Sequence, residues 1–299
     1  MGYRKIWIVG FDIVSSCQLR CIGCPNSTLK RPIEKIKMHN FEACLSNIDV
    51  DIIKSFRLFN FGEPLLHEDV PGVISAIKRQ KFKTKGIEIY TNAQHHDFEQ
   101  LKEIFKTKQL RSMTVSCDGD GTAADYEGQR PPAKWERLLE FLAKASEFQK
   151  QYSPETELGT CTICQTPEGQ QRWRAILDPL GIAPAFRGRW NMPDAQDFNP
   201  DMLRVIPNRP CVYLDTHRLY VNADGSVGTC CQHPQVLTLG NLKVQRYSEI
   251  FQGRPRRFLR ELHKTDRRAH PICGVCIAET HTPKLIKVVN SLFGRKNGA

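Results

Sequence analysis

Short apolar runs alternate with helix-like segments between residues 5 and 186, and this alternation restricts the folds that the chain can adopt. The six strand candidates are Lys5–Ile13, Ser55–Asn60, Gly86–Tyr90, Arg111–Ser116, Leu158–Ile163 and Ala183–Phe186. Such alternation favours a parallel sheet with right-handed crossovers. A closed barrel of eight units needs about 250 residues. The sequence therefore predicts an α/β fold built on an open, partial (β/α)6 TIM barrel.

Two of the intervening segments carry apolar residues at helical spacing. Steps of three and four residues place such side chains on one face of a helix. One set lies between the first two strand candidates and the other between the fourth and fifth: Met38, Phe41, Leu45, Ile48 and Ile52, then Trp135, Leu138, Leu139 and Leu142. Both segments are predicted to be helices.

The composition changes from Asn191 onward, which indicates a second, smaller domain. Four prolines punctuate a linker there, and a hairpin-like stretch, Leu219–Thr229, turns at Asp224-Gly225. A shift of this kind commonly marks a domain boundary. We expect a barrel over residues 1–205, an auxiliary domain over residues 206–283 and a basic tail over residues 284–299.

Twelve cysteines stand in a chain that shows no export signal. The opening segment, Tyr3–Val14, is interrupted by Arg4, Lys5 and Asp12, so it is too short and too polar for a signal peptide or a membrane span. Cysteines in such a chain point to metal binding or catalysis rather than to structural disulfides. The sequence predicts a protein of the reducing cytoplasm, without a membrane span.

Lysine and arginine outnumber aspartate and glutamate by 43 to 32, which gives a net charge of +11. The excess is densest over Arg254–Arg268. A basic stripe can meet nucleic acid, but it is more often a solvated helix face. Because the chain has no RNA-binding signature and no interleaved aromatic run, we interpret the stripe as a solvated face and do not expect a nucleic-acid partner.

Three cysteines follow the first strand candidate at a spacing that suits one metal cluster. Cys17, Cys21 and Cys24 are separated by three and then two residues. An iron–sulfur cubane normally takes four cysteine ligands, so three would leave one iron open for chemistry. Zinc is the alternative, although its cysteine pairs usually have two further ligands close in sequence. The nearest candidates here, His39 and Cys44, are not well spaced for that role.

Three further motifs follow the next three strand candidates in order. They are Gly62-Glu63-Pro64, Thr91-Asn92 and Ser116-Cys117-Asp118-Gly119. Together with the cysteine run, they resemble the radical S-adenosylmethionine (radical SAM) superfamily. The chain departs from the usual family pattern at Phe61, where the family has glycine, and at Gly23, where a bulky residue is common. Each motif alone is also ordinary turn chemistry.

The resemblance implies two cofactors at this end of the barrel. In the family, S-adenosylmethionine chelates the fourth iron of a [4Fe-4S] cluster held by cysteines that match Cys17, Cys21 and Cys24. Glu63 would bind the methionyl amine through a charge-assisted hydrogen bond. The remaining contacts with the cofactor are expected from Gly62, Pro64, Thr91, Asn92, Ser116 and Asp118.

Four later cysteines suggest a second metal site. Cys211, Cys230, Cys273 and Cys276 resemble the auxiliary-cluster domain of radical SAM proteins, in the short "twitch" form of the SPASM type. Four thiols satisfy a second [4Fe-4S] cluster fully and suit it to electron transfer. A structural zinc site with four cysteines is the alternative.

Five cysteines remain outside the two sets. Cys44 is expected to be a small core residue, and Cys161 and Cys164 to lie at a strand end. A thiol facing the cavity could return a hydrogen atom to a substrate radical, and Cys231 and Cys117 are the better candidates for that catalytic role.

The resemblance implies an enzyme that cleaves S-adenosylmethionine to a 5′-deoxyadenosyl radical, with an external reductant such as flavodoxin or ferredoxin. We expect a small-molecule, sugar- or aminocyclitol-like substrate that is oxidised or epimerised. Because sixteen residues precede Cys17, we do not expect a leader-binding module of the kind that peptide maturases often carry. Peptide maturation is therefore the alternative, and a small-molecule substrate is favoured over it. A polar substrate pocket is expected at Arg187, Arg189, Trp190 and Asn191. A zinc-binding scaffold and an RNA-directed protein are the non-enzymatic alternatives.

Overall fold

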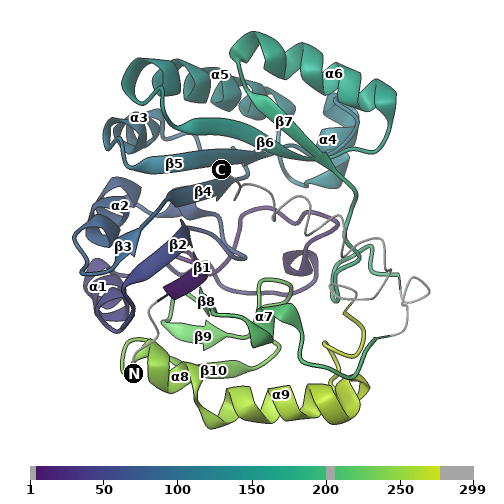
Figure 1. Ribbon diagram of the computed structural model, residues 1–299. Helices are drawn as coiled ribbons and strands as arrows, with labels where there is room; N and C mark the ends of the chain where they lie inside the picture. The colour runs from purple at the N-terminus through teal and green to yellow at the C-terminus, as the bar shows by residue number, and fades with distance from the viewer. Residues whose placement is uncertain (1–4, 200–205, 277–299) are drawn as a thin grey trace, which may run out of the picture.

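A parallel sheet with helices on its outer face forms the larger part of the molecule (Figure 1). The computed structural model describes residues 5–199 and 206–276. Six strands follow the order β1-β2-β4-β5-β6-β7 and pair in parallel. Their bounds are β1 Lys5–Phe11, β2 Ile52–Arg57, β4 Ile87–Thr91, β5 Leu110–Ser116, β6 Glu157–Ile163 and β7 Ala183–Arg187. The predicted open barrel of six strands is confirmed.

Helices connect these strands and cover the outside of the sheet (Figure 1). They are α1 Met38–Ser46, α2 Val70–Lys78, α3 Phe98–Lys106, α4 Ala123–Gln129, α5 Trp135–Tyr152 and α6 Pro167–Leu177. Short 3-10 helices lie at Pro25–Ser27, Pro64–Leu66 and Asp178–Leu180. Both predicted helices are present, but the first ends earlier than its apolar spacing suggested. Ile48 follows the end of α1, and Ile52 opens β2.

The two faces of β1 show how the sequence positions the site. Phe11 points to the helix layer, where its ring meets Phe41 edge-on with centroids 4.9 Å apart. Gly10 points the other way, and a Cβ there would stand 3.0 Å from the ring of Tyr220. Because side chains alternate along a strand, β1 directs Phe11 into the apolar core under the helices and Gly10 to the opposite face, where Tyr220 lies. The loop that carries Cys17 begins where this strand ends.

The C-terminal unit joins the same sheet instead of standing apart from it (Figure 1). Strand β8 (Arg218–Val221) pairs in parallel with β1, and the predicted hairpin continues into β9 (Ser226–Gly228). Gly225 turns the hairpin with a φ of 80°, a value that favours glycine. The unit also contains β10 Thr238–Asn241, α7 Val212–Asp215, α8 Tyr247–Phe251, α9 Arg254–Asp266 and a 3-10 helix, Arg267–Ala269.

The sheet thus has ten strands, in the order β10-β9-β8-β1-β2-β4-β5-β6-β7, and the short β3 (Lys83–Thr84) pairs with β2. Neither β3 nor β10 was predicted, because both strands are short and lack an apolar alternation. The predicted boundaries at 205 and 283 stay predictions, and the predicted tail lies outside the described residues.

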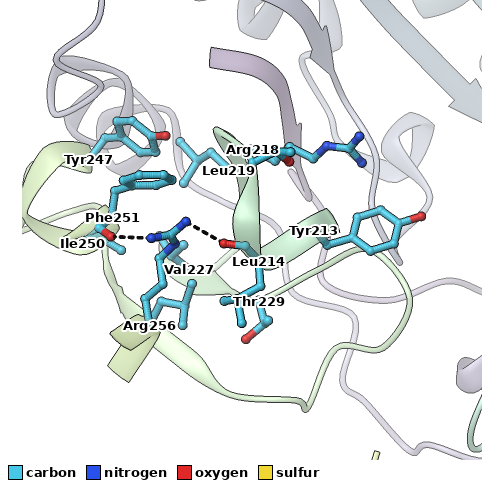
Figure 2. Close-up of a pocket in the computed structure, with 13 residues that line it drawn as sticks. Tyr213, Leu214, Arg218, Leu219, Val227, Thr229, Tyr247, Ile250, Phe251 and Arg256 are labelled. Atoms are coloured by element: carbon cyan, nitrogen blue, oxygen red, sulfur yellow. Dashed lines mark hydrogen bonds between the residues drawn. The ribbon is translucent and has the colours of Figure 1, made fainter. Parts of the chain in front are cut away.

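The basic stripe on α9 is only partly a solvated face. Arg256 is buried, and its guanidinium donates to the carbonyls of Leu214, at 2.6 Å, and Phe251, at 3.2 Å (Figure 2). It also lies 3.7 Å above the ring of Phe251. Arg267 is buried as well. The interpretation as a solvated face was wrong for these two arginines, which are buried inside the C-terminal unit. No helix in the described ranges is long and apolar enough to cross a membrane.

Candidate metal and cofactor site

The first three cysteines lie on one loop that leaves the end of β1. The amide of Cys24 donates to the carbonyl of Cys21 at 3.0 Å, which closes the loop on itself. Two more amides, those of Arg20 and Ile22, donate to the carbonyls of Pro131 and Gln129 beside α4, at 2.6 and 3.0 Å. The loop is therefore held against the end of α4 on both sides of Cys21.

The thiols of this loop lie in an environment that disfavours their charged form. Burial, then the nearby Glu63, raises the pKa of Cys17 to about 12. Burial, then Cys21, raises the pKa of Cys24 to about 11. Three thiolates here need compensating positive charge, which iron would supply. The donor set therefore fits an iron–sulfur cluster.

Glu63 is the most constrained carboxylate of the site. It is buried after β2, and its Oε1 accepts from the Thr91 hydroxyl at 2.8 Å and from the Leu65 amide at 3.1 Å. Its Oε2 accepts from the Asn92 amide at 2.7 Å. Burial raises the pKa of Glu63 to about 7, although these donors oppose the rise. A carboxylate has about four acceptor sites, so one is left for a cationic ligand.

Asn92 joins this carboxylate to the cysteine loop. Its backbone amide binds Glu63, while its side-chain Nδ2 lies 3.1 Å from the Sγ of Cys17 and 3.1 Å from the Oε1 of Gln18. Three motifs that are far apart in the sequence therefore meet around one asparagine. The predicted Thr91-Asn92 element lies where the motif order placed it, at the end of β4.

Asp12 holds the Gly-Glu-Pro turn, and the sequence analysis missed it. Its buried carboxylate accepts from the amides of Asn60, Phe61 and Gly62 at 2.7, 2.8 and 2.9 Å. Burial raises the pKa of Asp12 to about 6. A Cβ on Gly62 would stand 1.7 Å from the carbonyl oxygen of Val14, so the turn requires glycine there. A lone charge inside an otherwise apolar strand was the available signal for Asp12.

Asp118 and Arg130 form a second buried pair beside the cysteine loop. The guanidinium of Arg130 donates to Asp118, and the other carboxylate oxygen of Asp118 accepts from the Ile163 amide at 3.3 Å. The Nε of Arg130 has no partner among the described residues, although it is buried. An anionic ligand group would satisfy it. Ser116 is half-buried at the end of β5, one residue before Cys117.

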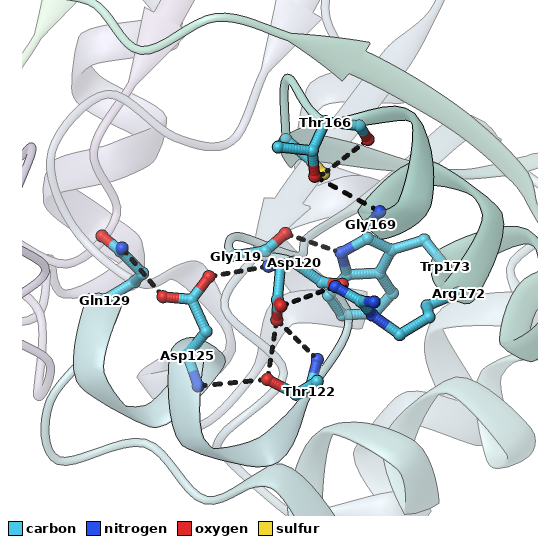
Figure 3. A network of polar contacts seen from close by, with 10 residues as sticks. Gly119, Asp120, Thr122, Asp125, Gln129, Thr166, Gly169, Arg172 and Trp173 are labelled. Atoms are coloured by element: carbon cyan, nitrogen blue, oxygen red, sulfur yellow. Dashed lines mark hydrogen bonds and ion pairs between the residues drawn. The ribbon is translucent and has the colours of Figure 1, made fainter.

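A polar network supports the turn that carries Asp118 (Figure 3). Gly119 has a φ of 93°, and its carbonyl accepts from the indole Nε1 of Trp173 at 2.9 Å. Asp120 forms an ion pair with Arg172 at 2.6 Å and accepts from Thr122 at the start of α4. The network ties the turn after β5 to both α4 and α6, so the Asp118 carboxylate has a rigid support.

Three of the four later thiols, those of Cys211, Cys230 and Cys273, belong to one cluster of buried residues in the C-terminal unit. Cys211 precedes α7, and Cys230 and Cys273 pack with Leu214, Val236 and Leu259 in a small apolar cluster separate from the main core. Burial raises the pKa of Cys273 to about 12, with Cys211 the next cause. Burial also raises the pKa of Cys230, while the amides of Gln232 and His233 donate to it. Cys276 is half-buried at the edge of the described residues.

The two candidate hydrogen donors lie in different surroundings. Cys117 is 0% exposed within the main core. Cys231 is half-buried, and its Sγ lies 3.7 Å from the Nε2 of Gln232. Burial, then Cys231, raises the pKa of both Tyr213 and Tyr220. Of the two, only Cys231 has a surface that a substrate could reach. Cys44 is a buried core residue, as expected.

The predicted substrate residues after β7 are mostly engaged with their own loop. Arg189 forms an ion pair with Asp197 at 2.7 Å and also donates to the Oε1 of Gln129 in α4. The side chain of Asn191 donates to the Asn199 carbonyl. Trp190 is 45% exposed. Arg187 donates to the Cys161 thiol, which lies on the neighbouring strand. Arg187 is the member of this group that contacts another strand of the barrel.

Comparisons with known proteins agree with this geometry. Residues 211–277 match the SPASM family, described as an iron–sulfur cluster-binding domain. The fold matches BtrN in complex with AdoMet and 2-DOIA, with a TM-score of 0.56 at 14% identity over 92% of this chain and 94% of that one. The fold is that of these radical SAM structures, and residues 211–277 resemble a SPASM-type domain.

Two other radical SAM structures resemble the molecule to a similar degree. Native anSMEcpe with bound AdoMet has a TM-score of 0.63 at 14% identity, over 95% of this chain and 99% of that one. SuiB of Streptococcus suis bound to S-adenosylmethionine has a TM-score of 0.54 at 12% identity, over 96% and 75%. A search of curated protein sequences gave no match. The expected radical SAM cofactors, iron–sulfur clusters and S-adenosylmethionine, agree with both the domain match and these structures.

Proposed function

We propose that the protein is a radical SAM enzyme that abstracts hydrogen from a small-molecule substrate. The observation that carries the proposal is the junction at Asn92, whose amide binds Glu63 while its side chain contacts the Sγ of Cys17. When bound, S-adenosylmethionine and a reduced cluster supply a 5′-deoxyadenosyl radical that attacks an unactivated C–H bond. The residues around Asn92 would orient that cofactor.

Each residue has a defined part in this arrangement. Cys17, Cys21 and Cys24 would hold the first cluster, and the free acceptor site of Glu63 would bind an ammonium group. The Nε of Arg130, buried beside Asp118 and Cys21, suits a carboxylate. Gly62 and Pro64 would shape the turn that carries Glu63, and Thr91 and Ser116 would provide further polar groups around the cofactor. An ammonium clamp and a carboxylate clamp near one cluster suit an amino-acid moiety.

Oxidation or epimerisation of a sugar- or aminocyclitol-like substrate is the reaction that we favour. The likeness to BtrN, whose structure contains 2-DOIA, supports a small substrate. A cluster held by Cys211, Cys230, Cys273 and Cys276 could accept an electron from the substrate radical. With four thiols it would have no open iron. Peptide modification is the second candidate, because anSMEcpe, a structure of the same fold, was determined with the Cp18Cys peptide.

Anaerobic reconstitution with iron and sulfide tests the enzyme class. We expect about eight irons per chain, as two cubanes require, and 5′-deoxyadenosine formation when dithionite or a reduced flavodoxin or ferredoxin is added. Stoichiometric zinc at the first three cysteines, with no cleavage of S-adenosylmethionine, contradicts the proposal and restores the metal-scaffold alternative.

The choice between oxidation and epimerisation depends on where the electrons go. A carbonyl product formed with one 5′-deoxyadenosine per turnover indicates oxidation. Deuterium incorporated from solvent, and lost in Cys231→Ala but not in Cys44→Ala, indicates epimerisation with Cys231 as the donor. Cys117→Ala tests the second candidate in the same assay. Turnover of a precursor peptide in place of small sugars favours the peptide alternative.

A further inference from the structure

His263 is a buried imidazole without a visible partner. It lies near the end of α9 and is 0% exposed, and neither of its ring nitrogens has a hydrogen-bond partner among the described residues. Leaving a buried polar group without a hydrogen bond destabilises the folded protein. Buried polar side chains are therefore almost always bonded, and an exception calls for a cause.

The position of His263 on α9 shows which buried residues share its side of the helix. The buried residues of this part of the chain, Leu259, His263 and Arg267, recur at four-residue steps and so share a side. Leu259 packs in the small cluster with the thiols of the C-terminal unit. Arg267 interacts electrostatically with Cys273. His263 lies between these two residues along the chain and on the same side of the helix.

The ring carries one donor and one acceptor at neutral pH. Burial, then Arg267 and His270, lowers the pKa of His263 to about 4, so the imidazole is neutral. His270 does not serve as its partner. The Nδ1 of His270 accepts from the amides of Ile272 and Cys273, and its Nε2 bonds the Val236 carbonyl.

We propose that the His263 N–H donates a hydrogen bond to a sulfur atom of the iron–sulfur cluster held by Cys211, Cys230, Cys273 and Cys276. The inference rests on the proposed function only in assigning an iron–sulfur cluster to those thiols. Hydrogen bonds to cluster sulfurs are one of the determinants of reduction potential. A donor stabilises the more negative reduced state, so His263 makes the auxiliary cluster easier to reduce. It acts as a positioning and tuning residue and does not touch substrate.

Redox titration of the auxiliary cluster alone tests this role. In the full chain with Cys17, Cys21 and Cys24 changed to alanine, the auxiliary cluster is the one that is reconstituted. His263→Leu should make its reduction about tenfold less favourable, which is a shift of about 59 mV to more negative potential for one electron. His263→Gln keeps a donor and should recover most of the shift. Lys264→Leu, at the exposed neighbouring position, should leave the potential unchanged.

Pulsed EPR provides a readout that needs no substitution. In protein labelled with 15N-histidine, the reduced auxiliary cluster should show a coupling to a histidine nitrogen, and His263→Gln should remove it. Absence of the coupling in the labelled protein overturns the inference, even if His263→Leu fails to load iron. An unchanged potential in a fully loaded His263→Leu protein also overturns it.

The two proposals fail in different ways. An iron-loaded auxiliary site without histidine coupling overturns the role of His263 and leaves the proposed function intact. Zinc at the auxiliary site overturns both the role of His263 and the proposed electron acceptor. Loss of 5′-deoxyadenosine formation concerns the first cysteine loop alone.

Discussion

The two cysteine sites of this molecule differ in what surrounds them. Cys17 and its two companions lie among charged and polar groups that retain free bonding capacity, such as Glu63 and Arg130. Three thiols of the C-terminal unit, those of Cys211, Cys230 and Cys273, lie in a cluster with Leu214, Val236 and Leu259. A site that must bind and release a polar cofactor needs spare donors and acceptors. A site that only accepts electrons needs a closed ligand set and little solvent.

The largest expected effect breaks the first site and leaves the second intact. Replacing Cys17, Cys21 and Cys24 with alanine should abolish 5′-deoxyadenosine formation and reduce iron from about eight to about four per chain, one cubane instead of two. Iron analysis and product chromatography measure both. The control is Cys44→Ala, a buried thiol outside both sites, which should keep the full iron content. Equal iron loss in the control would argue against the assignment of ligands.

Glu63→Gln should weaken the binding of S-adenosylmethionine without removing the cluster. A hydrogen bond to a charged group contributes about 1.5–3 kcal/mol, so we expect roughly ten- to a hundredfold weaker binding. Equilibrium binding to the reconstituted protein gives the affinity, and iron content should stay constant. Glu68→Gln, a change at an exposed position nearby, is the matched control. Unchanged affinity in Glu63→Gln would remove the glutamate from the cofactor site.

Asp12→Asn tests whether the support of the Gly-Glu-Pro turn matters to the first site alone. Its carboxylate holds three amides of that turn, so we expect roughly tenfold weaker cofactor binding, on the order of one lost hydrogen bond, and unchanged spectra of the auxiliary cluster. Normal binding at full cluster occupancy would contradict this role.

The pH dependence of unfolding gives a second measure of Asp12. Its pKa rises from 3.8 to about 6 on folding, so the native state binds more protons than the unfolded state between these values. Relative to Asp12→Asn, the wild-type apoprotein should therefore lose about 3 kcal/mol of unfolding free energy as the pH rises from about 4 to about 6. Anaerobic urea titrations across this range measure it. If the difference in unfolding free energy between the two proteins stayed constant with pH, the pKa of Asp12 would not be shifted on folding.

The smallest effect on cofactor cleavage is expected at the second site. Cys230→Ala and Cys273→Ala should lower iron toward about four per chain, the content of one cubane. They should leave the rate of 5′-deoxyadenosine formation without substrate turnover close to that of the wild type. The product formed from the substrate should disappear. Chromatography of both products in one reaction distinguishes these outcomes. Loss of cofactor cleavage along with the product would show that the two sites are not functionally separable.

Sequence reasoning predicted the barrel well because its signals are local. Strands such as β5 and β6 combine an apolar run with a turn signal, and the motifs follow those strands directly. Residues such as Asp12 and Arg130 were missed because their roles depend on partners 50 and 12 positions away, respectively. Arg256 and Arg267 were misinterpreted for a related reason. A helix periodicity identifies the buried side, but it does not show that an arginine can be buried there, or that it finds carbonyl partners as Arg256 does.

The pairing of β1 with β8 links the two cysteine sites mechanically. β1 runs directly into the loop of Cys17, and β8 leads through a tight hairpin to Cys230. The amide of Asp12 extends the pairing by donating to the Val221 carbonyl at 2.8 Å. The spacing between the two sites is therefore set by a ladder of backbone hydrogen bonds instead of a linker. Rates of electron transfer between them should be insensitive to viscosity and to insertions between β7 and α7.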